Sequence, residues 1–72
     1  MTNPTPQQIK DARQASGLTQ SAAASSVHVG IRAWQRWEAG DRKMPMNAWV
    51  LFIGLYPDAK IAAAETTQTS KI

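Results

Sequence analysis

Residues 18–40, LTQSAAASSVHVGIRAWQRWEAG, decide the fold of this chain. The stretch reads as two short helices joined by a tight turn. The spacing predicts a first helix over residues 20–26 with Thr19 as its N-cap, and a second over residues 31–38 that ends before Gly40. Everything outside the stretch is expected to support this pair.

The composition of the two helices predicts how they pack. Three alanines at residues 22–24 leave no bulk on the first helix, so a neighbouring backbone can approach it closely. Trp34 and Trp37 lie on one face of the second helix and supply the missing volume. The turn over residues 27–30 is about four residues long, which is the length found in a helix-turn-helix.

This pattern resembles the Cro/C1-type (XRE) helix-turn-helix family of DNA-binding repressors over roughly residues 6–56. The resemblance is carried by L-T-Q at residues 18–20, Ala24, Val27, Val29, the run W-x-x-W-E-x-G over residues 34–40, and Arg13 upstream. It implies an all-α fold: a compact, lambda-repressor-like DNA-binding domain of four to five helices, in which the second helix of the pair reads DNA.

Three positions depart from the family pattern. His28 stands where the turn usually has a glycine with positive φ, a conformation that histidine tolerates better than most side chains. Gly30 is the expected N-cap of the second helix, where serine or threonine is more common. Ala23 is smaller than the usual leucine or valine. None of these departures breaks the motif.

The length, composition and charge of the chain limit the classes of function that it can have. The chain has 72 residues, no cysteine, one histidine and a formal net charge of +3, so apolar packing must hold one small domain. Six basic and three acidic residues lie between residues 10 and 43, which concentrates positive charge in the proposed motif. With neither a membrane-length apolar run nor a signal peptide, the expected protein is cytoplasmic and nucleoid-associated, without metal, cofactor, small-molecule ligand or membrane partner.

The rest of the chain divides into four parts. We expect a disordered N-terminus over residues 1–4, the helix-turn-helix domain over residues 5–56, a short fifth helix over residues 57–65 and a flexible tail over residues 66–72. Thr5, Pro6 and Gln8 spell the start of the first helix, with a capping box, and Gly17 marks its end.

A fourth helix is expected between Pro45 and Pro57. Its predicted inward face consists of Ala48, Trp49, Leu51, Phe52 and Leu55. Met44 and Met46 are expected to fill gaps in and beside the preceding loop. The predicted core consists of Ile9, Ala24, Val27, Val29, Trp34, Trp37, Trp49 and Phe52. Aromatic residues interleaved with basic ones can also stack on single-stranded nucleic acid, but the helical spacing favours the core.

The resemblance implies an ion pair between Arg13 and Glu38. A planar guanidinium can donate two hydrogen bonds to one carboxylate and so join the first helix to the third. The alternative is two solvated charges that contribute little. The role of the pair is expected to be architectural.

The resemblance also divides the candidate DNA contacts into two classes. Arg32 and Arg36 are four residues apart and opposite the tryptophans, so both can point into a major groove, which the surrounding motif favours over the alternative of ordinary solvated charges. The expected base contacts are Ile31, Arg32, Gln35 and Arg36. The expected phosphate contacts are Thr19, Gln20, Gly30, Arg42 and Lys43.

The expected function is a transcriptional regulator, a repressor that binds a palindromic double-stranded DNA operator as a homodimer. The fourth helix and residues 55–61 are the candidate dimer surface, because exposed apolar residues concentrate there. The alternative is a protein-interaction module, an adaptor or antitoxin-like helix-turn-helix without strong DNA binding. We do not expect an enzyme, because no nucleophile, base and orienting group converge.

Overall fold

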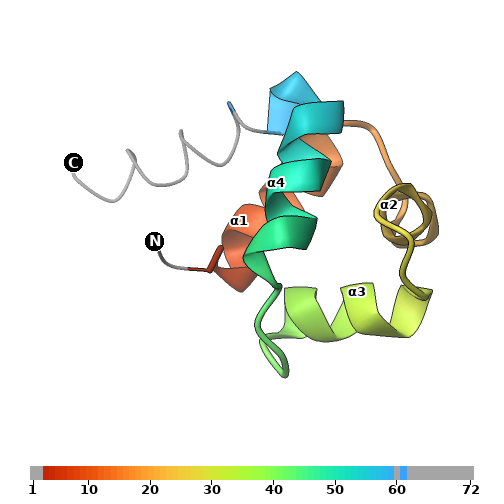
Figure 1. Ribbon diagram of the computed structural model, residues 1–72, viewed down its shortest axis with the longest axis vertical. Helices are drawn as coiled ribbons and strands as arrows, with labels where there is room; N and C mark the ends of the chain where they lie inside the picture. Colours follow the sequence, from red (N-terminus) through yellow and green to blue (C-terminus); the bar gives the residue numbers. More distant parts are fainter. Residues whose placement is uncertain (1–2, 60, 62–72) are drawn as a thin grey trace.

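The computed structural model describes residues 3–59 and 61, and this part of the chain is helical without any strand (Figure 1). The helices are α1 (Pro6–Ala15), α2 (Gln20–Ser26), α3 (Ile31–Ala39) and α4 (Met46–Leu55). Residues 57–59 and 61 are helical too. The all-α fold of four to five helices is therefore confirmed, while the expected tail and most of residues 60–65 lie outside the described residues. None of the described helices is long and apolar enough to span a membrane.

The first two helices begin where the sequence predicts, at residues whose side chains cap them. The Thr5 hydroxyl accepts a hydrogen bond from the Gln8 amide at 3.1 Å, and the Gln8 side chain accepts one from the Thr5 amide at 2.9 Å, which completes the capping box. The Thr19 hydroxyl accepts from the Ala22 amide at 3.1 Å. These caps satisfy amide groups that a helix cannot satisfy internally.

Each of the first three helices is followed, within two residues, by a residue with positive φ. These residues are Gly17 at 71°, His28 at 61° and Gly40 at 85°. After α2, the His28 amide donates to the Ser25 carbonyl and the Val29 amide to the Ala24 carbonyl, which is the hydrogen-bond pair of a Schellman motif. His28 thus adopts the left-handed conformation expected of the turn, without being glycine.

The helix-turn-helix geometry follows from these ends. In Figure 1, α2 is seen along its axis while α3 lies across the view, so the two helices meet at a steep angle. Ala23 and Ala24 on α2 are buried, and Trp34 on α3 is fully buried in the same core. Small residues on one helix and large ones on the other therefore do pack together.

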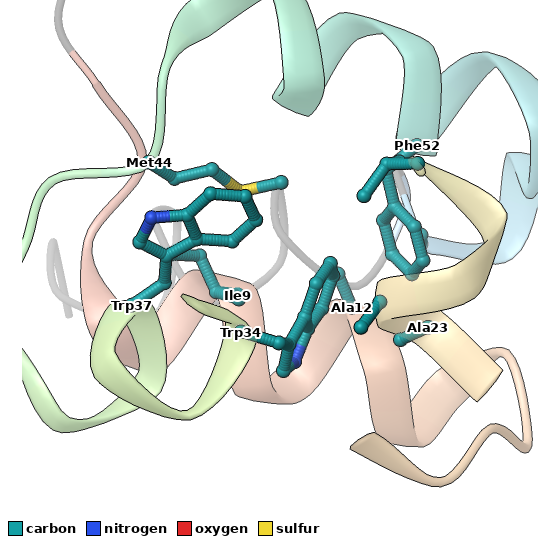
Figure 2. Close-up of a cluster of buried hydrophobic side chains, with 10 residues drawn as sticks. Ile9, Ala12, Ala23, Trp34, Trp37, Met44 and Phe52 are labelled. Carbon is teal, nitrogen blue, oxygen red and sulfur yellow. The ribbon is translucent and has the colours of Figure 1, made fainter. Parts of the chain in front are cut away.

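The core is built around the α3 tryptophans (Figure 2). The Trp34 ring centroid lies 5.0 Å from that of Phe52 on α4 and 5.7 Å from that of Trp37. The buried residues are Ile9, Ala12, Ala23, Ala24, Val27, Trp34, Trp37, Met44, Phe52 and Ala59. The other two predicted core residues, Val29 and Trp49, are partly buried against this cluster.

The predicted inward face of α4 is partly wrong. Leu51 and Leu55 are 41% and 51% exposed, whereas Ile53 packs against the core. Phe52 sits at the centre of the buried face, and a helix that buries Phe52 deeply turns Leu51 toward solvent. Ala59 is also fully buried, so the segment after α4 is anchored by a small residue rather than by the exposed Ile61.

The loop after α3 and the N-terminal end are both packed against the domain. Met44, expected to be a loop residue that fills a gap, is fully buried, and its side chain lies beside the Trp37 ring (Figure 2). Residues 3 and 4, expected in the disordered N-terminus, are packed: Pro4 is buried, and the Asn3 Nδ2 donates a hydrogen bond to the Met44 carbonyl at 2.6 Å. The Asn3 hydrogen bond joins residues 41 positions apart, so no local sequence pattern predicts that this end is packed.

Candidate nucleic-acid interface

α3 presents two opposite faces. Trp34 and Trp37 are 0% and 6% exposed on the inward face, while Arg32, Gln35 and Arg36 are exposed on the outward face. Because residues 32 and 36 are separated by one helical turn, their side chains leave the helix in the same direction. The burial of two indoles thus fixes which side of α3 faces outward.

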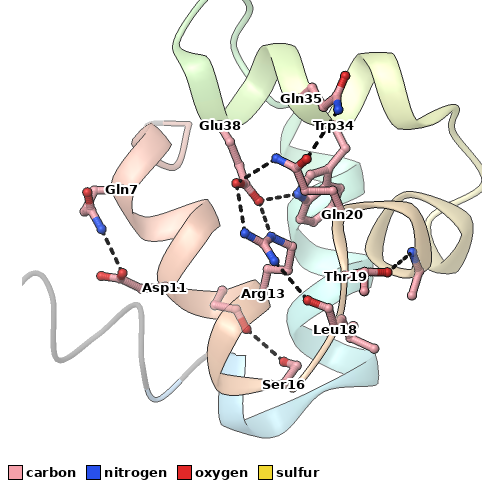
Figure 3. Close-up of polar contacts among 12 residues, drawn as sticks. Gln7, Asp11, Arg13, Ser16, Leu18, Thr19, Gln20, Trp34, Gln35 and Glu38 are labelled. Atoms are coloured by element: carbon pink, nitrogen blue, oxygen red, sulfur yellow. Dashed lines mark hydrogen bonds and ion pairs between the residues drawn. The ribbon is translucent and has the colours of Figure 1, made fainter.

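Glu38 joins α3 to the two preceding helices (Figure 3). Its Oε2 accepts hydrogen bonds from Arg13 Nε at 2.5 Å and from Trp34 Nε1 at 2.6 Å. Its Oε1 accepts from Gln20 Nε2 at 3.1 Å and from Arg13 Nη2 at 3.3 Å. The ion pair implied by the resemblance is therefore present, with side chains only 15% and 7% exposed for Arg13 and Glu38.

These contacts set the charge state of Glu38. Burial alone would raise the pKa of this carboxyl, but the hydrogen bonds from Arg13, Trp34 and Gln20, together with the Arg13 charge, outweigh burial and lower the pKa below its ordinary value. The carboxylate is consequently ionised at neutral pH. Arg13 also donates from Nη1 to the Leu18 carbonyl at 3.0 Å, which ties the start of the motif to α1.

Gln20 connects this buried network to the outward face of α3. Since its Nε2 donates to Glu38, its Oε1 is the atom that accepts from Gln35 Nε2, at 3.4 Å (Figure 3). The Gln20 side chain, expected to contact a phosphate, thus makes two hydrogen bonds within the protein and keeps its second N–H. Gln35, expected to contact a base, keeps its Oε1 and its second N–H for other partners.

The expected base-contact residues lie together. Arg32, Gln35 and Arg36 line one shallow hollow with Ala39 and Asp41. Ile31 is 42% exposed at the first position of α3. Asp41 was not singled out from the sequence; its amide donates to the Arg36 carbonyl at the end of α3, and this local turn brings an acidic residue beside the two arginines.

The expected phosphate contacts flank this face. Thr19 is exposed, and although its oxygen caps α2, its hydroxyl hydrogen remains available for donation. Gly30 is the exposed N-cap of α3 and makes no side-chain cap. Arg42 and Lys43 are exposed in the loop after α3. Among the described residues, no group of acidic, histidine or cysteine side chains could hold a metal ion.

Comparison with known families gives a match over most of the chain. A family model described as a helix-turn-helix domain matches residues 7–56, which span the segment from α1 to the residue after α4. The match agrees with the Cro/C1-type resemblance of residues 18–40. A search of curated proteins finds no match. Since the matched residues make up most of the sequence and include both helices of the motif, the chain belongs to the helix-turn-helix domain family.

Proposed function

We propose that this protein is a sequence-specific regulator that binds double-stranded DNA with α3 in the major groove. The observation that carries the proposal is the outward face of α3, on which Arg32, Gln35 and Arg36 lie together opposite the buried tryptophans. An arginine in this position can donate two hydrogen bonds to guanine O6 and N7, which discriminates by about 1–3 kcal/mol. Ile31 would contact a thymine methyl group.

Contacts with DNA backbone phosphates would hold α3 in position in the major groove. Thr19 at the start of α2 and Gly30 at the start of α3 offer a hydroxyl and backbone amides on one side of the groove. Arg42 and Lys43 offer two cations beyond the end of α3. Such contacts orient a protein on DNA but carry no sequence information. Gln20 would act here mainly by holding Gln35.

The proposed regulator acts as a homodimer, because one short recognition helix makes too few base contacts for useful specificity. The proposed dimer surface is the exposed side of α4, where Val50, Leu51 and Leu55 are 53%, 41% and 51% exposed. None of the ten residues of α4 is charged. Two copies can therefore meet there without opposing like charges, and a two-fold dimer reads a palindromic operator.

By analogy with the Cro/C1-type proteins that the sequence resembles, the proposed regulator is a cytoplasmic repressor that associates with the nucleoid through DNA. The exposed side of α4 also supports the second candidate function, a protein-interaction module, because apolar residues exposed on one helix suit a protein partner. The two candidates differ in their affinity for duplex DNA.

Binding to a random-sequence duplex at several salt concentrations separates them. For the DNA-binding regulator, we expect the logarithm of the association constant to fall linearly with the logarithm of salt concentration, by a slope of about 0.9 per phosphate contact. Replacement of Arg42 and Lys43 by alanine should reduce the slope by about two. Lys10→Ala is the matched control, because Lys10 is an exposed cation on α1 outside the proposed contacts. No salt-dependent binding by the wild type would leave the interaction module as the function.

A further inference from the structure

The N-terminal segment, residues 3–6, lies against the loop that follows α3. The Asn3 Nδ2 donates to the Met44 carbonyl at 2.6 Å, a hydrogen bond between residues 41 positions apart. Pro4 is buried. A Cβ atom added to Gly40 would lie 3.4 Å from Pro6 Cγ, so the start of α1 is in close contact with the backbone at the start of the loop.

Both ends of this loop, residues 40–44, are fixed. At one end, Gly40 has a φ of 85° and the Asp41 amide donates to the Arg36 carbonyl at 3.0 Å. At the other, the Met44 side chain is fully buried and the Met44 carbonyl is held by Asn3. Between these fixed ends, the side chains of Asp41, Arg42 and Lys43 are exposed.

The same two segments enclose a hollow. Its volume is about 460 Å³, and its lining residues are Asn3, Pro4, Thr5, Pro6, Trp37, Gly40, Arg42 and Lys43. Arg42 and Lys43 are the charged residues of this lining. The apolar side chains of two prolines and a tryptophan form a large part of the wall. The hollow therefore combines a rigid wall with two cations on neighbouring residues.

We propose that the N-terminal segment and the loop form one phosphate-binding unit, in which Arg42 and Lys43 each hold a DNA backbone phosphate and Asn3 positions the loop that carries them. This role rests on the proposed function and assigns Asn3 no contact with DNA. Long cationic side chains lose conformational freedom on binding, and a loop that is already ordered reduces this loss. Asn3 and Met44 are 41 positions apart in the sequence, so the unit depends on tertiary structure rather than on a local motif.

The test compares Asn3→Ala with the wild type for binding to a random-sequence duplex. We expect affinity at low salt to fall by about threefold to tenfold, and the slope of affinity against salt to fall by about one, because the phosphate contact weakens. Ser16→Ala is the matched control, since it also removes one side-chain hydrogen bond to a backbone carbonyl, from Ser16 Oγ to Ala12 at 2.8 Å, at the other end of α1. The control should leave the slope unchanged.

A second arm places Asn3→Ala in a variant that already carries Arg42→Ala and Lys43→Ala. If Asn3 acts through the two cations, it should have no further effect there. In the DNA-free protein, heteronuclear NOE measurements should show that the Arg42 and Lys43 amides become more mobile in Asn3→Ala.

The outcomes are distinguishable. Salt-dependent binding by the wild type with an unchanged slope in Asn3→Ala overturns the role of Asn3 alone, as does an equal loss in the Arg42 and Lys43 background. Absence of binding by the wild type overturns the proposed function and this role with it. An unchanged NOE at both amides overturns the positioning of the loop even if affinity falls.

Discussion

At the residue scale, the positive φ of His28 is a backbone angle that the turn requires and that lowers the stability of the fold. This φ of 61° ends α2 and starts the turn toward α3, and the hydrogen bonds from His28 and Val29 to α2 carbonyls require that conformation. A side chain with a Cβ is strained there, whereas glycine is not. The turn therefore keeps the geometry of the motif at some cost in stability.

Replacement of His28 by glycine should stabilise the protein. Relief of the left-handed strain is offset in part by the greater freedom of glycine in the unfolded chain, which leaves a gain of about 0.5–1 kcal/mol in the free energy of unfolding. Urea unfolding followed by tryptophan fluorescence measures this gain in the free energy of unfolding. His28→Ala is the control, because it keeps the Cβ and should give no gain. A less stable His28→Gly variant would show that the histidine side chain itself stabilises the turn.

At the scale of the elements, Glu38 decides how α1, α2 and α3 are held relative to one another. Four hydrogen bonds reach its carboxylate from Arg13, Gln20 and Trp34. Replacement by glutamine removes the charge opposite a guanidinium that is only 15% exposed. We expect Glu38→Gln to lose about 3 kcal/mol of stability, because an uncompensated charge is left largely buried.

The stabilising effect of ionised Glu38 should also appear in the pH dependence of the free energy of unfolding. Because folding lowers the pKa of Glu38, its contribution is fully present above the pKa of the unfolded chain and is lost as pH falls through the folded value. The wild type should therefore lose part of its advantage over Glu38→Gln below about pH 4.3, the ordinary glutamate value. Free energies of unfolding from pH 3 to pH 7 measure this difference. Parallel profiles for the two proteins would contradict the assigned role.

The boundaries of α1, α2 and α3 were predictable because their signals are local. Thr5 and Gln8 are three residues apart, Thr19 caps its own helix, and Gly40 directly follows α3. The helical spacing of Trp34 and Trp37 likewise identified the buried and outward faces of α3. The resemblance supplied the Arg13 and Glu38 pair, but not the contacts of Gln20 and Trp34 with the same carboxylate.

At the scale of the whole molecule, the errors have a common cause. Asn3 and Met44 are joined by a hydrogen bond across 41 positions, and no periodic pattern marks the burial of Met44 or Ala59. The rotation of α4 is equally a tertiary property. Every residue near Phe52 is apolar, so the sequence does not distinguish the partly buried Ile53 side from the exposed Leu51 side.

The exposed side of α4 gives a prediction about assembly. Leu55→Glu should dissociate the proposed dimer, because a carboxylate would be buried opposite its own copy across a two-fold axis. Sedimentation equilibrium should then report a monomer where the wild type is a dimer. Gln14→Glu, the same negative charge on the exposed side of α1, should leave the dimer intact. A monomeric wild type, or a dimeric Leu55→Glu variant, would reject α4 as the interface.

The claim that α3 reads base sequence is tested most directly by selection of binding sites from random duplex DNA, with the wild type, Arg32→Ala and Lys43→Ala side by side. We expect a palindromic consensus for the wild type, loss of preference at one base position per half-site for Arg32→Ala, and weaker binding with an unchanged consensus for Lys43→Ala. An Arg32→Ala consensus identical to that of the wild type would contradict the claim.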